Sequence, residues 1–223
     1  MSITIDGTSI SDVTIDGQQV QEITIDGTTV WEAISYPLIV DDFEDDDFSE
    51  YGFKENYTHT TEQVYEGSYS IKSDTSVLKL YSVSGLNNYP QPSQSFECAF
   101  YATDTDVDWQ LYFGLQEVVD LPEECYEIEV TPDFDLSIIK KTPSENTTLA
   151  SSSSIDFTTN QWLKVKVNWY EDGTIEAKLT DTDGTVRTST SAVDTTYTDG
   201  GIGIRIGDGA KANSDVYADG FKI

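Results

Sequence analysis

Basic side chains are scarce in this 223-residue sequence: 12 Lys and Arg stand against 41 Asp and Glu, a formal net charge of −29. Nucleic acid is not expected as a partner, because its phosphates attract proteins through a basic face. Self-repulsion of this size opposes compaction in dilute buffer, but at molar salt the Debye length falls to about 3 Å and screens it. The composition indicates a halophilic protein. An ordinary acidic protein, or one that binds many cations, is the alternative.

Histidine and cysteine are also rare. With His59 as the single histidine, neither a histidine-based catalytic triad nor a site with several histidine ligands is expected. The two cysteines are too few for a disulfide-dense scaffold. Cys98 alternates with phenylalanines and is predicted to point into a core, whereas Cys125 alternates with glutamates and is predicted to point outward. Two unpaired thiols are therefore expected.

Long apolar runs and helical periodicity are missing too. The start, MSITIDGTSI, has neither the basic residues nor the apolar centre of a signal peptide, and no run is long enough to cross a bilayer. We therefore expect no export signal and no membrane insertion. Apolar residues recur instead with a period of two, which predicts an all-β protein.

A ten-residue unit occurs three times in residues 3–32, as ITIDGTSISD, VTIDGQQVQE and ITIDGTTVWE. The Asp-Gly pair in each copy is a type I′ turn signal and predicts three very short hairpins. Their aliphatic residues share one face, which hairpins of this size cannot bury alone. Residues 1–36 are thus expected to pack on the following domain, on a carrier protein, or on copies of themselves. A homo-oligomer, either trimer or pentamer, is the most economical arrangement.

The TIDG unit resembles repeats in structural proteins of tailed viruses, those of haloarchaea especially. The resemblance covers about the first 36 residues and implies a stem that docks to other virion proteins. A virion component assembles in the host cytoplasm and leaves by lysis, which is compatible with the missing export signal.

A second domain is expected over residues 38–223, because Pro37 cannot continue a β ladder. Short alternating segments separated by polar turns predict a sandwich or barrel. Strands are expected at 68–72, 77–81, 95–101, 109–115, 126–131, 135–140, 162–170, 174–180, 202–206 and 215–223.

The clearest strand pair lies in QWLKVKVNWYEDGTIEAKLTDTDG, where apolar and polar residues alternate on both sides of a tight turn. Together with LIVDDFED, VYEGSYSIK, GGIGIRIGDG and VYADGFKI, this segment resembles the concanavalin A-like, laminin-G-like jelly roll. The resemblance spans residues 38–223 and implies one antiparallel β-sandwich with a lectin-like character. Because this fold hosts many functions, a function must be argued from a site.

A cation site is implied by the same resemblance. The segment DDFEDDD at 41–47 supplies carboxylate oxygens, which Ca²⁺ prefers. Members of the family often hold a structural Ca²⁺ between this segment and the final strand, and Asp42, Glu44 and Asp219 match that arrangement. A structural Ca²⁺, or another cation at high salt, is therefore expected. A solvated acidic loop is the alternative, and no organic cofactor is expected.

Sugar recognition by this fold commonly uses aromatic faces with polar neighbours. The segment DVDWQLYFG offers Trp109 and Tyr112, and YSVSGLNNYP offers Tyr81, Asn87 and Tyr89. These five residues are the candidate ligand-binding residues. A plain role in the core or on the surface is the alternative for each.

Glycoside hydrolysis is not expected. It needs two carboxylates that flank the scissile bond, and laminarinase-type relatives carry them in an E-I-D-x-x-E strand. The nearest match, EIEVTP, has Glu129 at the second acidic position but Pro132 at the third. A polar strand face explains this segment, and the protein is expected not to be an enzyme.

These expectations combine into a virion surface protein of a halophilic archaeal tailed virus, as a capsid turret, decoration or tail fibre. Its jelly roll would face outward and attach to a host surface glycan or glycoprotein. The alternatives are a cellular haloarchaeal carbohydrate-binding or adhesion protein, and a glycoside hydrolase or lyase.

Overall fold

The computed structural model describes residues 41–49, 51–73, 78–82, 90–104, 107–131, 135–152, 159–207 and 215–222, together with the backbone of six short strands before residue 33. The chain divides into two compact units, Met1–Pro37 and Leu38–Ile223. The described residues contain no helix long and apolar enough to cross a membrane.

The first unit consists of separate two-stranded hairpins, one for each copy of the repeat. Each hairpin pairs residues on either side of an Asp-Gly dipeptide, as the two-residue turn signal predicts. The paired strands are β1 (Ile3–Ile5) with β2 (Thr8–Ile10), β3 (Thr14–Ile15) with β4 (Gln18–Gln19), and β5 (Glu22–Ile25) with β6 (Thr28–Glu32).

The second unit is a sandwich of two seven-stranded antiparallel sheets. Sheet 1 has the order β15 (Glu145–Ser152), β14 (Leu136–Thr142), β13 (Cys125–Val130), β12 (Asp108–Leu115), β19 (Gly201–Gly207), β10 (Leu78–Ser82), β7 (Tyr51–Glu55). Sheet 2 has the order β18 (Val186–Val193), β17 (Thr174–Asp181), β16 (Trp162–Trp169), β11 (Gln94–Ala102), β20 (Val216–Lys222), β9 (Ser70–Ser73), β8 (Tyr57–Thr60).

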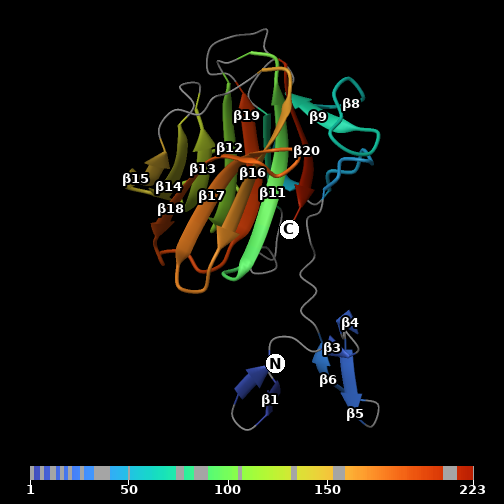
Figure 1. The fold of residues 1–223 in the computed structure, drawn as a ribbon, viewed down its shortest axis with the longest axis vertical. Coiled ribbons are helices and arrows are strands. Elements are labelled where there is room, and N and C mark those ends of the chain that lie inside the picture. Colours follow the sequence, from blue (N-terminus) through green and yellow to red (C-terminus); the bar gives the residue numbers. More distant parts are fainter. Residues whose placement is uncertain are drawn as a thin grey trace. The chain divides into compact units, whose positions relative to one another are not determined.

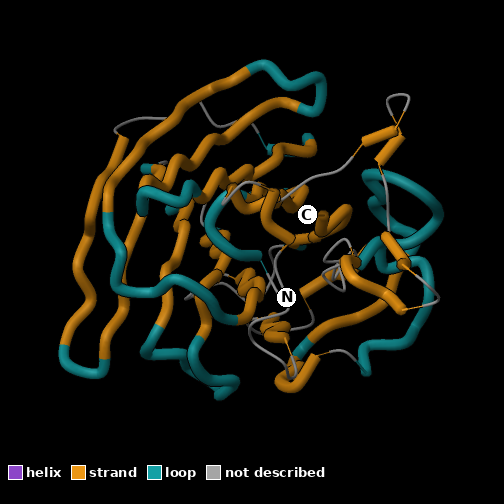
Figure 2. The backbone as a smooth tube through the Cα atoms, turned by 90° about the horizontal axis from the view of Figure 1, so that it is seen from below, coloured by secondary structure: helices purple, strands orange, loops and turns teal. Residues whose placement is uncertain are grey.

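Figures 1 and 2 show these layers, and the described residues include strands and loops but no helix. The predicted all-β sandwich of the jelly-roll type is confirmed. All ten predicted strands overlap observed ones. The four strands of the sandwich that the sequence did not predict are β7, β8, β15 and β18, which are the outermost strands of the two sheets.

The main core lies between the sheets and is rich in aromatic residues. Trp109 on β12 stacks on Phe100 on β11, with ring centroids 5.3 Å apart and an angle of 14° between the planes. Along β16, buried residues alternate with partly exposed ones, so this strand turns one apolar face to the core. Cys98 is fully buried here, which confirms its predicted orientation.

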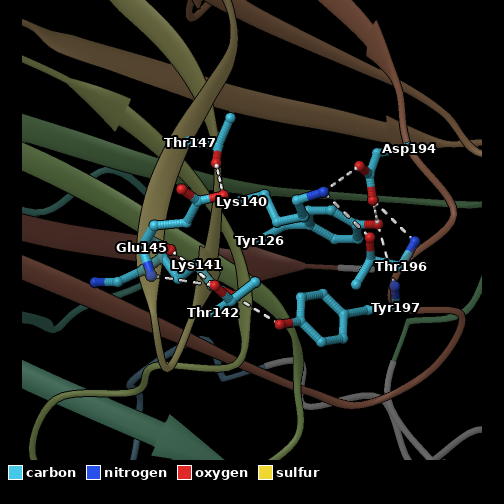
Figure 3. Close-up of polar contacts among 9 residues, drawn as sticks. All are labelled: Tyr126, Lys140, Lys141, Thr142, Glu145, Thr147, Asp194, Thr196 and Tyr197. Atoms are coloured by element: carbon cyan, nitrogen blue, oxygen red, sulfur yellow. Dashed lines mark hydrogen bonds and ion pairs between the residues drawn. The ribbon is translucent and has the colours of Figure 1, made fainter.

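A polar cluster fastens the two sheets where the chain passes from β18 in sheet 2 to β19 in sheet 1 (Figure 3). Asp194 accepts hydrogen bonds from Tyr126 Oη (2.6 Å) and from the Thr196 amide (2.8 Å), and forms an ion pair with Lys140 Nζ at 2.8 Å. Tyr197 Oη donates to the Lys141 carbonyl at 2.6 Å. Although burial raises the pKa of Asp194, hydrogen bonds from Lys140, Thr196 and Tyr126 outweigh burial and hold it well below its ordinary value.

Candidate functional site

The candidate site lies on the outer face of sheet 1, the face turned away from sheet 2. Cross-strand neighbours share a face, so the strand register places two rows of side chains there. One row contains Phe53, Tyr81, Gly203, Tyr112 and Glu127. The parallel row contains Glu55, Lys79, Arg205, Gln110 and Glu129. The outer face is thus aromatic along one row and charged along the next.

An apolar cluster, distinct from the main core, occupies the centre of this face. It consists of Tyr81, Tyr112, Leu115 and Cys125, all 2% exposed or less. The rings of Tyr81 and Tyr112 meet edge to face with centroids 5.4 Å apart. They meet across β19, because Gly203 has no side chain. A Cβ at this position would run into the Tyr81 ring and lie 2.7 Å from the Leu80 carbonyl oxygen.

A chain of polar contacts lies around Tyr112. The Gln110 side-chain amide donates to Glu129 Oε1 at 2.9 Å, and its carbonyl accepts from Tyr112 Oη at 3.1 Å and from Arg205 Nη1. Lys141 forms an ion pair with Glu127 at 3.1 Å and lies 5.4 Å from the centroid of the Tyr112 ring. These contacts fix the orientation of Tyr112 and of the two glutamate side chains.

Burial shifts the pKa values of the titratable side chains on this face. Burial raises the pKa of Glu127 above its ordinary value, and the neighbouring Lys141 opposes the rise. Burial also raises the pKa of Tyr81 and of Tyr112 well above the usual range. Both phenols therefore stay protonated at neutral pH and can donate hydrogen bonds.

Two buried donors on this face have no partner among the residues that the structure describes. They are the Tyr81 hydroxyl and the Nε of Arg205. A buried donor without an acceptor costs about 1–3 kcal/mol. A ligand oxygen placed beside Tyr81 or Arg205 would recover part of that cost. A ligand that offers oxygen acceptors and an apolar face would match these donors and the aromatic cluster.

The structure separates the aromatic residues predicted to bind a ligand. Tyr81 and Tyr112 lie together on the outer face, but Trp109 is 1% exposed and belongs to the main core. Trp109 and Tyr112 are three residues apart on one strand, so they point to opposite faces, and Trp109 presents no surface to a ligand. Asn87 and Tyr89 lie outside the described residues.

The sequence did not single out Gln110, Arg205 or Lys141 as members of the site. A signal was present for Arg205, which is the one charged residue in the strand GIGIRIG and so had to face away from a core. Gln110 alternates with Trp109 and Leu111, which gives the same indication more weakly. Lys141 is brought to the site by its register opposite Cys125.

Cys125 faces outward as predicted, yet it is fully buried because the second apolar cluster covers it. Burial raises the pKa of its thiol to about 12. Cys98 lies on the inner face of sheet 2, in the main core. Both cysteines are free, as expected.

The carboxylates predicted to hold a cation accept hydrogen bonds from main-chain amides. Glu44 accepts from the Ser68 and Tyr69 amides at 2.6 and 2.9 Å. Asp219 is fully buried and accepts from the Tyr65, Glu66 and Gly220 amides. Asp42 Oδ1 accepts a hydrogen bond from the Glu44 amide at 3.2 Å.

These bonds, with the pairing of Asp41 and Phe221, join the first segment to the last strand. The described residues contain no group of three or more His, Cys, Asp or Glu arranged for a metal. A cation at Asp42, Glu44 and Asp219 stays a prediction.

No protein-family model and no curated protein matches this sequence. Solved structures of similar fold include a Bacillus subtilis protein of unknown function with a galectin-like fold, at 11% identity and a TM-score of 0.51 over 75% of this chain and 86% of that one. The carbohydrate recognition domain of Emp47p is 15% identical, with a TM-score of 0.51 over 84% and 94% of the two chains.

A Bacillus licheniformis β-glucanase is also similar, at 12% identity and a TM-score of 0.51, over 75% of this chain and 80% of that one. At these identities the similarity establishes the fold alone, which is that of galectin-like and concanavalin A-like jelly rolls.

Proposed function

We propose that the protein binds carbohydrate through the outer face of sheet 1. The observation that carries this proposal is the pair of buried, unpartnered donors, Tyr81 Oη and Arg205 Nε, beside the aromatic cluster. Sugars present hydroxyl oxygens to such donors and C–H faces to aromatic rings. The shared fold with a carbohydrate recognition domain and a β-glucanase supports the same ligand class.

We infer that the site binds without catalysis. Glu127 is held by Lys141, and Glu129 by the Gln110 amide, so each carboxylate already has a partner. Glycoside hydrolysis is the competing function. One observation favours it: Glu127 and Glu129 are two residues apart on one strand and share a face, roughly 6–7 Å along the backbone. This is near the carboxylate spacing of glycosidases.

Calorimetry with a soluble β-1,3-1,4-glucan and a mannan tests the binding site. Tyr81→Phe should weaken binding about five- to tenfold, the effect of one hydrogen bond. Tyr170→Phe, an exposed tyrosine beyond β16 in sheet 2, is the matched control and should bind like the wild type. Absence of binding to a broad glycan panel at millimolar sugar would refute the site. Release of reducing ends that is lost in Glu127→Gln would instead establish a hydrolase.

We further propose that the protein is displayed on the surface of a virion of a halophilic archaeal tailed virus, as a turret, decoration or tail fibre. Net charge −29 supports a saline environment, and the three repeats support a self-associating stem. The sandwich would then carry the carbohydrate site toward a glycosylated host surface, and several copies would raise avidity.

Light scattering in molar salt tests the display role. The full chain is expected to be a trimer or pentamer, and residues 38–223 alone a monomer. A monomer in both cases would remove the support for the stem. The melting temperature should also rise between dilute buffer and molar potassium chloride, because salt screens the repulsion among carboxylates.

A further inference from the structure

The segment that joins β12 to β13, residues 116–124, lies beside the outer face of sheet 1 and is called the strap. Its two ends are fastened: the Gln116 amide donates to the Glu124 carbonyl at 3.0 Å, and the Gln116 side chain donates to the carbonyls of Gly114 and Asp199 at 3.0 and 2.8 Å.

The middle of the strap folds back over the candidate site. Val118 packs against the cluster of Tyr81, Tyr112, Leu115 and Cys125. Asp120 forms an ion pair with Lys79 on β10. In sheet 1, β19 lies between β12 and β10, so Asp120 reaches across about 10 Å of sheet from the strand where the strap begins. The strap therefore covers the two tyrosines.

Val118 and the buried Pro122 are the packed residues of the strap, and its other contacts between the fastened ends are weak. The Asp120 side chain is 61% exposed, so water and salt screen its ion pair with Lys79. Val119 and Leu121 are exposed and contribute little packing to the sheet. The strap also carries four carboxylates above a face that contains Glu55, Glu127 and Glu129, and like charges oppose closure. A segment of this kind opens at small cost.

We propose that the strap is a lid over the outer face of sheet 1, latched by the Asp120–Lys79 ion pair, and that a ligand reaches Tyr81 and Arg205 only when the lid opens. The inference rests on the proposed carbohydrate site for the identity of the ligand. The closed lid explains how Tyr81 and Tyr112 are almost fully buried although they lie on the outside of a sandwich. Opening exposes the two unpartnered donors and Cys125 together.

The two free thiols report opening independently of any ligand. Cys125 belongs to the outer cluster against which Val118 of the strap packs, whereas Cys98 lies in the main core between the sheets. Lid opening exposes Cys125 alone, and only unfolding of the sandwich exposes Cys98. Iodoacetamide is uncharged, so the net charge of the protein does not bias its approach, and peptide mass spectrometry measures alkylation of each cysteine separately.

In the full-length protein, Cys125 should be alkylated at least tenfold faster than Cys98. Asp120→Asn should raise the alkylation rate of Cys125 about two- to fivefold, the factor expected for loss of an exposed ion pair, and leave the alkylation rate of Cys98 unchanged. Glu123→Gln is the matched control, because it removes the same charge from the same strap at an exposed residue. It should leave both rates unchanged. Asp120→Asn should also speed association of the β-glucan by a similar factor.

Equal rates for the two thiols in the wild type would overturn the lid. So would an Asp120→Asn variant that matches Glu123→Gln, or one in which Cys98 accelerates as much as Cys125. The proposed carbohydrate-binding function is tested separately. It is wrong if no glycan binds, even when the alkylation rates of the two cysteines still indicate a lid. A lid without a carbohydrate ligand and a carbohydrate site without a lid are thus distinguishable outcomes.

Discussion

Two pairs of neighbouring strands, β16–β17 in sheet 2 and β12–β13 in sheet 1, differ in how far the side chains of their outer faces are buried. Along β16 and β17, buried residues alternate with partly exposed ones almost without interruption. Along β12 and β13, nearly every residue is buried. In a single sandwich only the inner faces meet, so a strand buried on both faces has an additional cover.

The polar residues of the two outer faces also differ. On sheet 2, Lys178 pairs with Glu176 at 2.9 Å, and both are about one-quarter exposed. On sheet 1, Glu127 is 3% exposed and depends on Lys141. Charged residues of the first kind keep a face soluble, whereas those of the second kind are costly unless paired. The comparison therefore favours sheet 1 over sheet 2 as the location of the proposed binding site.

The largest effect that could break this comparison is expected from Lys141→Met. It leaves the Glu127 carboxylate buried without its cation, which should lower the free energy of unfolding by about 3 kcal/mol. Lys166→Met on sheet 2 removes a lysine that is 3.9 Å from Glu97 and 42% exposed, and should change stability by less than about 0.5 kcal/mol. Urea denaturation measures both. Similar losses for the two variants would mean that the outer faces are energetically alike.

A smaller loss, about 2 kcal/mol, is expected from Asp194→Ala, because the charged hydrogen bonds that join the sheets disappear. The pKa of Asp194 is lowered in the fold, so its contribution is complete above the unfolded value of 3.8 and is lost as pH falls below it. Urea midpoints of the wild type should therefore drop below pH 4, and Asp194→Asn should flatten that drop. Glu171→Gln, which removes an exposed carboxylate in the turn before β17, should reproduce the wild-type acid profile.

The smallest effect, about 1–2 kcal/mol, is expected from Gly203→Ala, which pushes the Tyr81 ring away from Tyr112. Near-ultraviolet circular dichroism should change as the tyrosine pair separates, and glucan binding should weaken. Unchanged tyrosine signals would show that the outer cluster adapts to a methyl group and is less ordered than the inner core.

The sequence predicted the inner strands of both sheets but none of the four edges. An inner strand such as β16 needs alternating apolar residues to face the core, and that alternation is visible in the sequence. Edge strands have fewer neighbours, so polar segments such as β15 (ENTTLASS) and β18 (VRTSTSAV) suffice. Their position follows from pairing with β14 and β17, which a local pattern does not contain.

The candidate site was half predictable for a related reason. Alternation indicates which residues share a face, and it placed Cys98 and Cys125 correctly. It does not indicate whether an outer face is covered, so Cys125 is buried although it points outward. The cover over Tyr81 and Tyr112 depends on the strap folding back to Lys79, a contact between residues 41 positions apart.

The edge strands β15 and β18 lie against each other across the sandwich, and Thr188 Oγ1 donates to Ser152 Oγ at 2.9 Å. A foreign strand that approached this side would meet two neighbouring edges rich in hydroxyl groups instead of one open apolar ladder. Crowded copies of the protein are therefore protected on this side from sheet-to-sheet aggregation, even where concentrated salt has removed the repulsion between their charges.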